Sequence, residues 1–256
     1  MSELTTLTNR VIVITGASRG LGRAMAITLA EQGAVIVATA RSTGDTPDSA
    51  QDTVQHILAA GGRGLALTVD VRDEAQVRAM VEQVLAHYGR VDVLVNNAGL
   101  MIGDIAFDDT SPALWRTILD TNLTGAFLCC HVVVPVMKQQ GAGVIVNISS
   151  GAAVRAGFLN VPYGVSKAGL DRLTLGLGAE LQAAGIACIS LSPPVSDTAT
   201  VRHMYPRRDF SAWAHPPELT AQALNAVLVD NPMQYTGQVL PVREYLQHKG
   251  LSPQDG

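Results

Sequence analysis

The sequence predicts an α/β domain in which a parallel sheet of about seven strands is doubly wound, with helices on both faces. Two observations support this fold class. Short runs rich in β-branched residues alternate with amphipathic segments from one end of the 256-residue chain to the other. The runs are also apolar almost throughout, which is typical of parallel strands buried on both faces and joined by right-handed helical crossovers.

The composition agrees with this architecture and excludes one class of partner. The chain has 47% hydrophobic residues and 24 glycines but only 4% aromatic residues, which fits a sheet between Ala- and Gly-rich helices better than an aromatic-rich β-sandwich. A length of 256 residues permits one large α/β domain or two small ones. The net charge of -4 comes without a basic cluster, so nucleic acid is excluded as a partner, because neutralising phosphates requires a concentrated Lys/Arg face.

Seven short runs are predicted as strands, and the stretches between them as helices. We find neither a repeat nor a long linker, and we interpret the polar stretch 42–49 as a loop that leads into a helix. One domain spanning 1–256 is therefore predicted. In chain order, the predicted strands are 11–15, 35–39, 65–69, 91–95, 144–148, 186–191 and 238–240.

One segment after the sixth strand breaks the alternation. Residues 198–217 hold Met204, Tyr205, Phe210 and Trp213 among charged residues and prolines. A connection of this length and composition is typical of a mobile lid over a binding site rather than of a core element. We therefore predict a substrate lid in this segment.

The cysteines and the N-terminus indicate an intracellular protein without a metal centre. Cys129, Cys130 and Cys188 are odd in number, lack metal-ligand spacing and lie in apolar runs, so reduced core thiols are predicted. The first residues show no basic segment followed by an apolar one, and no window approaches the roughly 18 uninterrupted apolar residues of a membrane span. We expect a cytoplasmic protein that uses neither a membrane nor a metal ion.

A glycine-rich turn follows the first predicted strand and precedes a helical run that begins at Arg23. Its three glycines permit a tight turn and let a pyrophosphate approach backbone N–H groups at a helix N-terminus. A glycine pattern alone is a weak signal, but its place between strand and helix favours dinucleotide binding over an ordinary loop. The candidate cofactor residues in this turn are Gly16, Ser18, Arg19, Gly20, Leu21 and Gly22.

A tyrosine and a lysine lie four residues apart in a predicted helix. At that spacing Tyr163 and Lys167 share one helix face. A phenol titrates near ~10, so it transfers protons near neutrality only where a positive charge stabilises the phenolate. The two residues are therefore a candidate acid/base pair, although such a pair taken alone is more often a solvated surface pair.

Five motifs in order along the chain resemble those of the short-chain dehydrogenase/reductase family. The glycine spacing differs from G-x-G-x-x-G and resembles the family's Thr-Gly-x-x-x-Gly-x-Gly. The other four are an Asn-Asn-Ala-Gly after the fourth strand, a helix asparagine, a strand-end serine and a Tyr-x-x-x-Lys. In this chain they are 96–99, Asn122, Ser150 and 163–167, and 236–237 resembles the threonine-glycine before the last strand. The resemblance implies a Rossmann-like fold and a nicotinamide-dependent oxidoreductase.

The resemblance also implies a role for each of four catalytic residues. Reducing a carbonyl requires a hydride on carbon and a proton on oxygen, and Tyr163 would donate that proton. Lys167 would depress the pKa of the tyrosine and hold the nicotinamide ribose. Ser150 would hydrogen-bond the substrate oxygen, and its place 13 positions before Tyr163 selects it over Ser149, which is predicted to be structural. Asn122 would position a water that connects Lys167 with solvent. Ser150 and Asn122 could instead bond to nearby backbone.

The end of the second strand bears on the choice between NAD(H) and NADP(H). A carboxylate there would repel a 2′-phosphate, but this chain has Ala40 followed by Arg41, and Arg19 could face the same phosphate. This arrangement resembles that of family members that prefer NADP(H). Arg41 could instead stack on adenine or be a solvated arginine. Asp70 and Val71 resemble the pair that contacts adenine, and Asp70 could instead cap the next helix. The remaining candidate cofactor residues are Ser42, Asn97, Ala98, Gly99, Tyr163, Lys167, Pro193 and Thr198.

The chain departs from the family pattern after the sixth strand. The family has Pro-Gly there and, two residues later, a valine or isoleucine that helps to hold the nicotinamide amide. Here Pro194 replaces the glycine and Ser196 the aliphatic residue, and only Thr198 keeps its expected identity. A proline removes an N–H and fixes φ near ~-65°, so nicotinamide anchoring or lid motion is expected to differ.

Mostly apolar residues are predicted to line the substrate pocket, which favours an aliphatic, alicyclic or aromatic ketone or aldehyde. Two alternatives remain open. The basic residues Arg202, His203, Arg207 and Arg208 suit a 3-oxoacyl thioester on an anionic carrier, or a solvated loop. The second alternative is a non-catalytic NADP(H)-sensing protein with the same fold. Apolar segments 127–137 and 170–181 could pair between copies, and the resemblance implies a homodimer or homotetramer. The candidate substrate residues are Ser150, Ala152, Val154, Phe158, Leu159, Met204, Tyr205 and Trp213.

Overall fold

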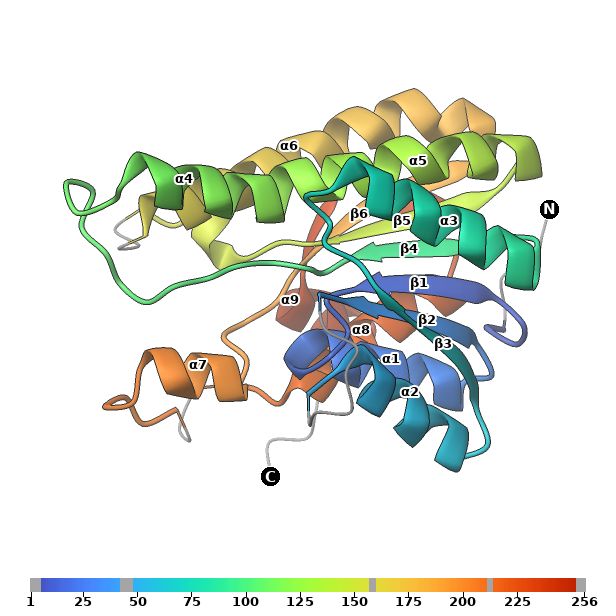
Figure 1. The fold of residues 1–256 in the computed structure, drawn as a ribbon, viewed down its shortest axis with the longest axis horizontal. Coiled ribbons are helices and arrows are strands. Elements are labelled where there is room, and N and C mark those ends of the chain that lie inside the picture. The colour runs from blue at the N-terminus through green and yellow to red at the C-terminus, as the bar shows by residue number, and fades with distance from the viewer. Residues whose placement is uncertain (1–5, 42–47, 157–159, 211–213, 252–256) are drawn as a thin grey trace.

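The computed structural model describes residues 6–41, 48–156, 160–210 and 214–251, and within these ranges it contains the predicted doubly wound sheet. Seven parallel strands lie in the order β3-β2-β1-β4-β5-β6-β7 (Figure 1). The predicted strands all form, with ends that differ by at most two residues. Their bounds are β1 Val11–Thr15, β2 Val35–Ala40, β3 Arg63–Thr68, β4 Val93–Asn96, β5 Gly143–Ile148, β6 Ile186–Ser192 and β7 Val239–Pro241.

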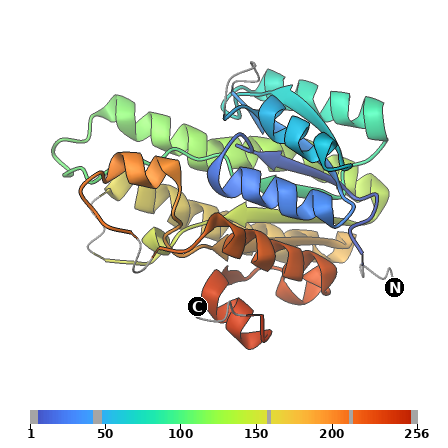
Figure 2. The ribbon, with the colours of Figure 1, turned by 90° about the horizontal axis from the view of Figure 1, so that it is seen from below.

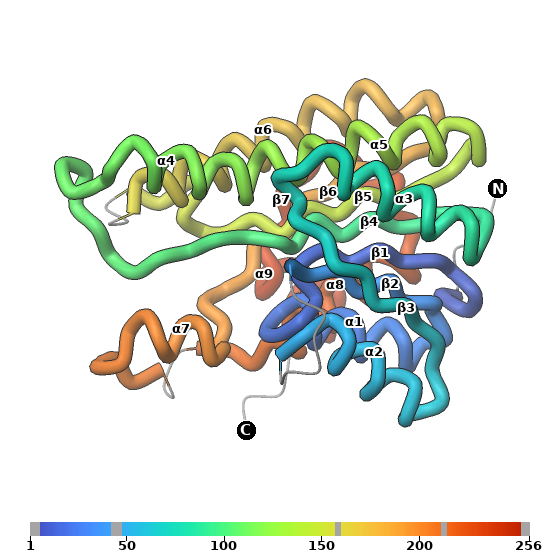
Figure 3. The backbone as a smooth tube through the Cα atoms, viewed as in Figure 1, coloured from blue at the N-terminus to red at the C-terminus, as the bar shows by residue number. Residues whose placement is uncertain are grey.

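Helices cover both faces of the sheet (Figures 1 and 3). On one face, buried residues of α1 (Gly20–Glu31), α2 (Ala50–Ala59) and α8 (Pro217–Val229) form one apolar cluster with the strands. On the other face, α3 (Glu74–Tyr88) and α5 (Gly125–Gln140) form the second, and α6 (Val161–Leu181) lies beside α5. The C-terminal helix α9 (Val242–His248) packs against α8 (Figure 2).

The order in which the chain adds strands to the sheet reverses at β1, with β2 and β3 on one side of it and β4 to β7 on the other. This strand pairs with β2 on one side, Val11 opposite Val35, and with β4 on the other, Ile12 opposite Val93. The connections that leave the carboxyl ends of β1 and β4 therefore diverge to opposite faces. In doubly wound sheets a crevice opens at this point, and it is the usual place for a bound ligand.

A continuous helical stretch runs from Pro112 to Gln140. It comprises α4 (Pro112–Leu119), a π-helical turn η1 (Asp120–Thr124) and α5. By length and composition alone this stretch could cross a membrane, but 39% of its apolar window is buried inside the protein, and core helices of soluble proteins meet the same criterion. Its contacts with α3, β4 and β5 show that α5 serves here as a covering helix of the sheet.

The three cysteines lie in the core, as predicted. Cys129 and Cys130 are on α5 and Cys188 is on β6, and all three are buried free thiols. Burial raises the pKa of the Cys130 thiol to about 12, while a hydrogen bond from Asn96 opposes that shift. Thiols in this environment stay protonated and behave as small apolar groups.

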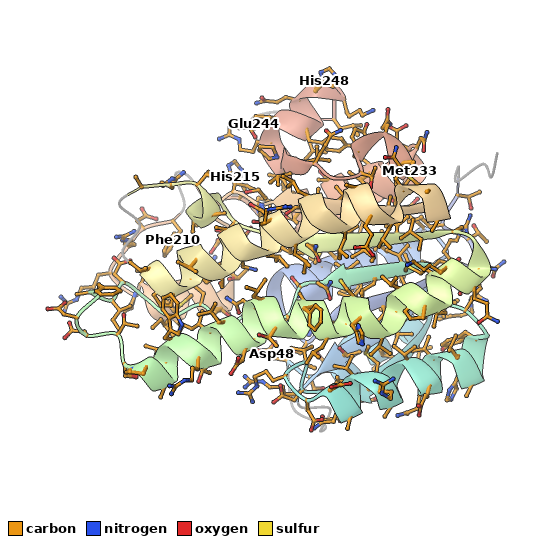
Figure 4. All side chains as sticks on the ribbon, turned by 90° about the horizontal axis from the view of Figure 1, so that it is seen from above. Asp48, Phe210, His215, Met233, Glu244 and His248 are labelled. Atoms are coloured by element: carbon orange, nitrogen blue, oxygen red, sulfur yellow. The ribbon has the colours of Figure 1, made fainter. Side chains whose placement is uncertain are left out.

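The segment predicted as a lid is more structured than expected. It contains a short helix α7 (Ala199–Met204), and its last residue, Pro217, already belongs to α8. Phe210, which we predicted to lie outside the core, is only 6% exposed and meets the ring of Tyr205 edge-on, with 6.3 Å between centroids. Figure 4 shows Phe210 at the end of the molecule where α6 begins. This edge-to-face contact between Tyr205 and Phe210 adds to the burial of their rings.

Candidate active site

A single cavity of about 1080 Å³ runs along the carboxyl ends of the strands. It begins at the glycine turn after β1 and ends between the loop after β4 and the segment that holds α7, which lie at the same end of the molecule (Figure 3). Most of the predicted site residues line it. Those are Gly16, Ser18, Arg19, Gly20, Leu21, Gly22, Arg41, Asp70, Val71, Asn97, Ala98, Gly99, Ser150, Ala152, Tyr163, Pro193, Thr198, Met204 and Tyr205.

The glycine turn is closed tightly against the loop after β4. Gly16 has φ +65°, and a Cβ there would lie 2.8 Å from the Cα of Ala98. A Cβ on Gly22 would overlap the carbonyl oxygen of Gly16 and lie 2.6 Å from Nδ2 of Asn97. That Asn97 amide nitrogen donates to the carbonyl oxygens of Thr15 and Gly16, at 2.8 and 3.0 Å. Glycine at these positions is therefore a steric requirement.

The N-terminus of α1 opens into the cavity with its backbone N–H groups available. Arg19 occupies the N-cap position in extended conformation, and its side chain makes no capping hydrogen bond. The first turn also contains no acidic residue. Free N–H groups and the positive end of the helix dipole suit a pyrophosphate, so this end of the cavity fits a dinucleotide.

The adenosine end carries positive charge. Arg19 and Arg41 both line the cavity, and Ala40, at the end of β2, takes the place where a carboxylate would repel a 2′-phosphate. Asp70 also lines the cavity, but its carboxylate is held by the guanidinium of Arg72, at 2.9 and 3.1 Å from Nε. This hydrogen-bonded pair lowers the pKa of Asp70.

Two alternatives for the loop after β3 are decided by the structure. Asp70 does not cap the next helix, because the N-cap of α3 is Asp73, whose carboxylate accepts from Ala75 N–H at 2.9 Å and Gln76 N–H at 3.2 Å. Asp70 instead turns back toward Arg72. Ser42, the neighbour of Arg41, lies outside the described residues.

Tyr163 lies in the first turn of α6, which is fixed by a buried asparagine. Asn160 is the N-cap residue, and its side-chain oxygen accepts from Tyr163 N–H at 3.2 Å. Its side-chain nitrogen donates to the carbonyl oxygens of Ile102 and Gly103, at 2.9 and 3.3 Å. Asn160 therefore ties the helix that carries the tyrosine to the loop after β4. We did not predict this role, although an asparagine three residues before a helical tyrosine is a recognisable capping signal.

Ser150 and Tyr163 are brought together by the end of β5 and the start of α6. Burial raises the pKa of Tyr163, and a side-chain hydrogen bond with Ser150 partly opposes the shift. Ser150 Oγ also accepts from Ala152 N–H at 3.2 Å, because it caps the short turn η2 (Gly151–Ala153). Both the predicted contact with Tyr163 and the alternative contact with backbone are therefore present. The neighbouring Ser149 also lines the cavity, and its buried Oγ has no partner in the described part of the chain.

Lys167 is 96% buried beneath Tyr163, but its effect on the tyrosine differs from our expectation. Its Nζ lies 5.7 Å from the centre of the Tyr163 ring and donates to Ile148 O at 2.7 Å. Burial lowers the pKa of Lys167 to about 8, while the negative charge of Asp171, one turn further along α6, opposes the shift. Burial of its own side chain raises the pKa of Tyr163, in place of the depression that we predicted.

Asn122 occupies the π-helical turn between α4 and α5. Its side-chain oxygen accepts from Leu100 N–H at 2.6 Å, and its nitrogen donates to Leu100 O and Ser166 Oγ, both at 3.0 Å. The side chain therefore bonds to the neighbouring loop and to the catalytic helix. A Cβ on Gly99 would lie 3.6 Å from Asn122 Oδ1 and 3.7 Å from Lys167 Nζ, so these groups surround the same point. π turns frequently occur at functional sites.

The unusual segment after β6 is anchored to the far end of the lid. Ser196 is buried and forms an isolated bridge with His215, while Ser196 Oγ donates to its own segment, at Pro194 O. His215 N–H donates to Val195 O at 2.9 Å, and Asp197 N–H donates to His215 O at 2.8 Å. Thr198 begins α7, and its Cγ2 lies 3.4 Å from the Cβ position of Gly20. The lid thus contacts the phosphate-binding turn.

The substrate end differs most from the prediction. Val154 is 87% exposed and does not line the cavity, because the turn η2 directs it outward. Phe158, Leu159 and Trp213 lie outside the described residues. The structure adds polar residues that we did not predict, Asp104 and Arg155 among them.

A charged cluster joins the two sides of this end. Tyr205 Oη donates to Asp104 Oδ1 at 2.9 Å, Arg208 bonds Asp104 at 3.4 Å, and the Arg208 guanidinium lies 4.8 Å from the Tyr205 ring centre. Burial raises the pKa of Tyr205 to about 12, and the hydrogen bond to Asp104 adds to that shift. No sequence motif predicts this cluster, because Asp104 lies about 100 positions before Tyr205 and Arg208.

Comparison with known proteins places the chain in a family. A family model described as "short chain dehydrogenase" matches residues 10–209. Dehydrogenase/reductase SDR family member 1 of Mus musculus is 33% identical, over 96% of this chain and 84% of its own length. Cis-4-hydroxycyclohexanecarboxylate dehydrogenase of Sinomonas cyclohexanicum is 35% identical, over 91% and 94%.

Solved structures agree with this assignment. One protein from Beutenbergia cavernae, described as an NAD(P)-dependent gluconate 5-dehydrogenase and solved with NADP bound at low occupancy, superposes with a TM-score of 0.84. It is 29% identical, and the match covers 94% of this chain and 97% of that one. The glycine turn, the uncapped helix end, Ser150 and Tyr163 line one cavity, and Lys167 is buried beneath the tyrosine. The chain belongs to the short-chain dehydrogenase/reductase family of oxidoreductases, which bind a nicotinamide cofactor.

Proposed function

We propose that the protein is an NADP(H)-dependent oxidoreductase that interconverts a carbonyl and an alcohol, with Tyr163 as the general acid/base. The observation that carries this proposal is that Ser150 and Tyr163 meet on the wall of a cavity whose other end fits a dinucleotide, with Lys167 buried directly beneath the tyrosine. We propose that the chain acts as one catalytic domain, with the segment 198–217 as its substrate lid.

The side chains of this cluster divide the proton chemistry between them. When bound, the nicotinamide supplies or accepts the hydride. Tyr163 gives its phenolic proton to the carbonyl oxygen in reduction, or takes the hydroxyl proton in oxidation, and Ser150 holds the same oxygen by a hydrogen bond. Lys167, with a pKa near 8, returns a proton toward the tyrosine and hydrogen-bonds the ribose of the cofactor. Asn122 keeps the loop after β4 in register with the catalytic helix.

The preference for NADP(H) is supported by charge. Two guanidinium groups line the adenosine end, and Ala40 stands where a carboxylate would reject the 2′-phosphate. The carboxylate of Asp70, which also lines this end of the cavity, is neutralised by its hydrogen bonds with Arg72. A 2′-phosphate would therefore meet positive charge and little repulsion.

The decisive experiment is turnover of a panel of ketones, aldehydes and alcohols with NADPH/NADP⁺ and with NADH/NAD⁺, by wild type and Tyr163→Phe. We expect kcat/KM to be higher with the phosphorylated cofactor and to fall about 10²- to 10⁴-fold in Tyr163→Phe, since a general acid/base contributes that much. Binding of NADPH, followed by its fluorescence, should be unchanged. Near-normal turnover by Tyr163→Phe would contradict the proposal.

Two other functions fit less well. The hypothesis that the substrate is a 3-oxoacyl thioester on an anionic carrier requires a basic lid. Two of the lid arginines are already paired with carboxylates, Arg202 with Asp197 at 2.6 Å and Arg208 with Asp104. A non-catalytic NADP(H)-sensing protein would not need the buried lysine and the Ser150–Tyr163 hydrogen bond. Turnover of any carbonyl in the panel excludes the sensing function, and preference for an acyl thioester would favour the other.

We also propose a homodimer or homotetramer in the cytoplasm. Apolar side chains on the outer faces of α5 and α6 support the assembly, because Phe127, Val165 and Leu175 are 48, 41 and 43% exposed. Light scattering of wild type and Phe127→Glu would test it, since a buried glutamate at an interface should shift the mass toward the monomer. Fractionation of the producing cells would test the location.

A further inference from the structure

Arg155 places a positive charge on the same wall of the cavity as Ser150. It lines the cavity, and its backbone N–H donates to Gly151 O at 3.1 Å, which closes a turn just after the catalytic serine. One terminal guanidinium nitrogen lies 4.0 Å from the position that a Cβ would take on Gly151. The turn therefore folds this charge back toward Ser150 instead of extending it away from the site.

The other arginines and lysines that line this end of the cavity, or lie directly beneath it, already have partners, and Arg207 on the lid does not line the cavity. Arg208 is bonded to Asp104 and lies over the ring of Tyr205, and Lys167 donates to Ile148 O. Arg19 and Arg41 belong to the opposite end of the cavity, beside the glycine turn and β2. Within the described ranges, Arg155 has neither an acidic partner nor a hydrogen bond from its side chain. It is the guanidinium at this end whose charge is not compensated.

We propose that Arg155 binds a carboxylate of the substrate, and that the substrate is a compact hydroxy or oxo carboxylic acid. The inference rests on the proposed function. A guanidinium presents a planar fork of donors that matches a carboxylate bidentately. Arg155 is itself exposed at the cavity wall, so the specificity of this bond comes from its geometry and charge. The short turn between Ser150 and Arg155 keeps the charge close to the serine, so a compact acid that reaches both side chains is favoured.

The carboxylate takes no part in the redox step. In oxidation, the hydroxyl O–H bond breaks and its proton goes to Tyr163, while the carbinol C–H bond breaks and its hydride goes to oxidised cofactor. A C=O bond forms, and the carboxylate stays bound to Arg155 unchanged. Reduction is the reverse. The expected role of Arg155 is therefore to orient the substrate and raise its affinity, and neutral carbonyls should lose little when it is replaced.

The test compares two substrates of equal size, 4-oxocyclohexanecarboxylate and its primary amide, with wild type, Arg155→Gln, Arg155→Lys and Arg116→Gln. Arg116 is a matched control, because it is an exposed arginine on nearby α4 that does not line the cavity. Wild type should prefer the carboxylate by about 10- to 100-fold in kcat/KM, the range expected of a hydrogen bond to a charged group. Arg155→Gln should lose that preference through KM and leave the amide unchanged. Arg155→Lys should keep part of it, and Arg116→Gln all of it.

Several outcomes would overturn the inference without touching the proposed function. They are equal turnover of carboxylate and amide by wild type, equal losses in Arg155→Gln and Arg116→Gln, or reduction of cyclohexanone or an acetoacetyl thioester in preference to the carboxylate. If no carbonyl is reduced with either cofactor, the proposed function fails by itself. Binding then decides the inference: calorimetric titration of cyclohexanecarboxylate into NADP⁺-loaded protein should show affinity in wild type and Arg116→Gln that Arg155→Gln loses. Equal affinity in all three would contradict it.

Discussion

The two ends of the cavity are built by different means. The adenosine and phosphate end is made mainly of backbone: glycines without room for a Cβ, an uncapped helix terminus and loops closed by hydrogen bonds to main-chain groups. The substrate end is made of side chains, including the cluster of Asp104, Tyr205 and Arg208 and the uncompensated charge of Arg155. Backbone recognition accepts one shape, whereas side-chain walls can be exchanged without altering the fold. The first end therefore depends on main-chain geometry, and the second on the choice of side chains.

The comparison predicts its largest effect at Gly22. In Gly22→Ala, the new methyl group would overlap Gly16 O and crowd Asn97 Nδ2, so the turn must open. We expect the Kd for NADPH to rise by about 100-fold or more, because the N–H groups no longer converge on the pyrophosphate, and stability to fall by about 1–3 kcal/mol. Fluorescence titration and chemical denaturation measure the two effects.

Gly61→Ala is the control for that substitution, because a Cβ on Gly61 would meet nothing within 4 Å, although Gly61, unlike Gly22, has positive φ. It should lose some stability through backbone strain and bind NADPH normally. Equal cofactor affinity in Gly22→Ala and wild type would show that backbone geometry does not define this end.

A charge change at the end of β2 should alter the choice of cofactor. Ala40→Asp puts a carboxylate where the 2′-phosphate is expected to lie, between Arg19 and Arg41. We expect the ratio of kcat/KM for NADPH over NADH to fall by about 10- to 100-fold, since a like charge at close range costs on that order. Steady-state kinetics with one carbonyl substrate and both cofactors give the ratio. An unchanged ratio would mean that Arg19 and Arg41 do not bind the 2′-phosphate.

Replacing Asn160 tests the connection between α6 and the loop after β4, because Asn160 caps this helix and bonds to that loop. Asn160→Ala should lower the free energy of unfolding by about 1 kcal/mol for the cap, and more for the buried bonds to Ile102 and Gly103. We also expect kcat to fall by about tenfold, because a tyrosine displaced even slightly loses alignment. Asp73→Ala, which removes the cap of α3, should cost similar stability and leave kcat intact. Parallel losses of kcat in both variants would contradict a positioning role for Asn160.

The smallest effect is expected at Asp171. Its carboxylate accepts from Ser190 Oγ at 2.8 Å and opposes the burial that lowers the pKa of Lys167 to about 8. In Asp171→Asn the pKa of Lys167 falls further, so the ammonium is lost at lower pH as the pH rises. The alkaline limb of the pH profile for reduction should therefore move toward acid, with no more than about a tenfold loss of kcat/KM at a fixed pH above 8. Asp171→Glu should restore part of the lost activity. A pH profile that does not move in Asp171→Asn would show that Asp171 does not affect the pKa of Lys167.

Much of the cofactor end could be predicted from sequence because its constraints are local. Three glycines within seven residues and a tyrosine four positions before a lysine fix distances along the chain without knowledge of the rest. The strands could also be predicted, since most of their residues are apolar and most strands are buried on both faces. The lid was not, because its order depends on pairings such as Ser196 with His215 that no local pattern encodes.

The sequence by itself determined the doubly wound sheet, the glycine turn after β1 and the positions of the proposed acid/base residues, because each depends on spacing along one strand or helix. Tertiary structure alone decided the rest: the clamp of Asn160 on the loop after β4, the pairing of Arg208 with Asp104, and the isolation of Arg155. Whether a charge is compensated depends on the groups that surround it in space, and those groups come from segments as much as 100 residues away.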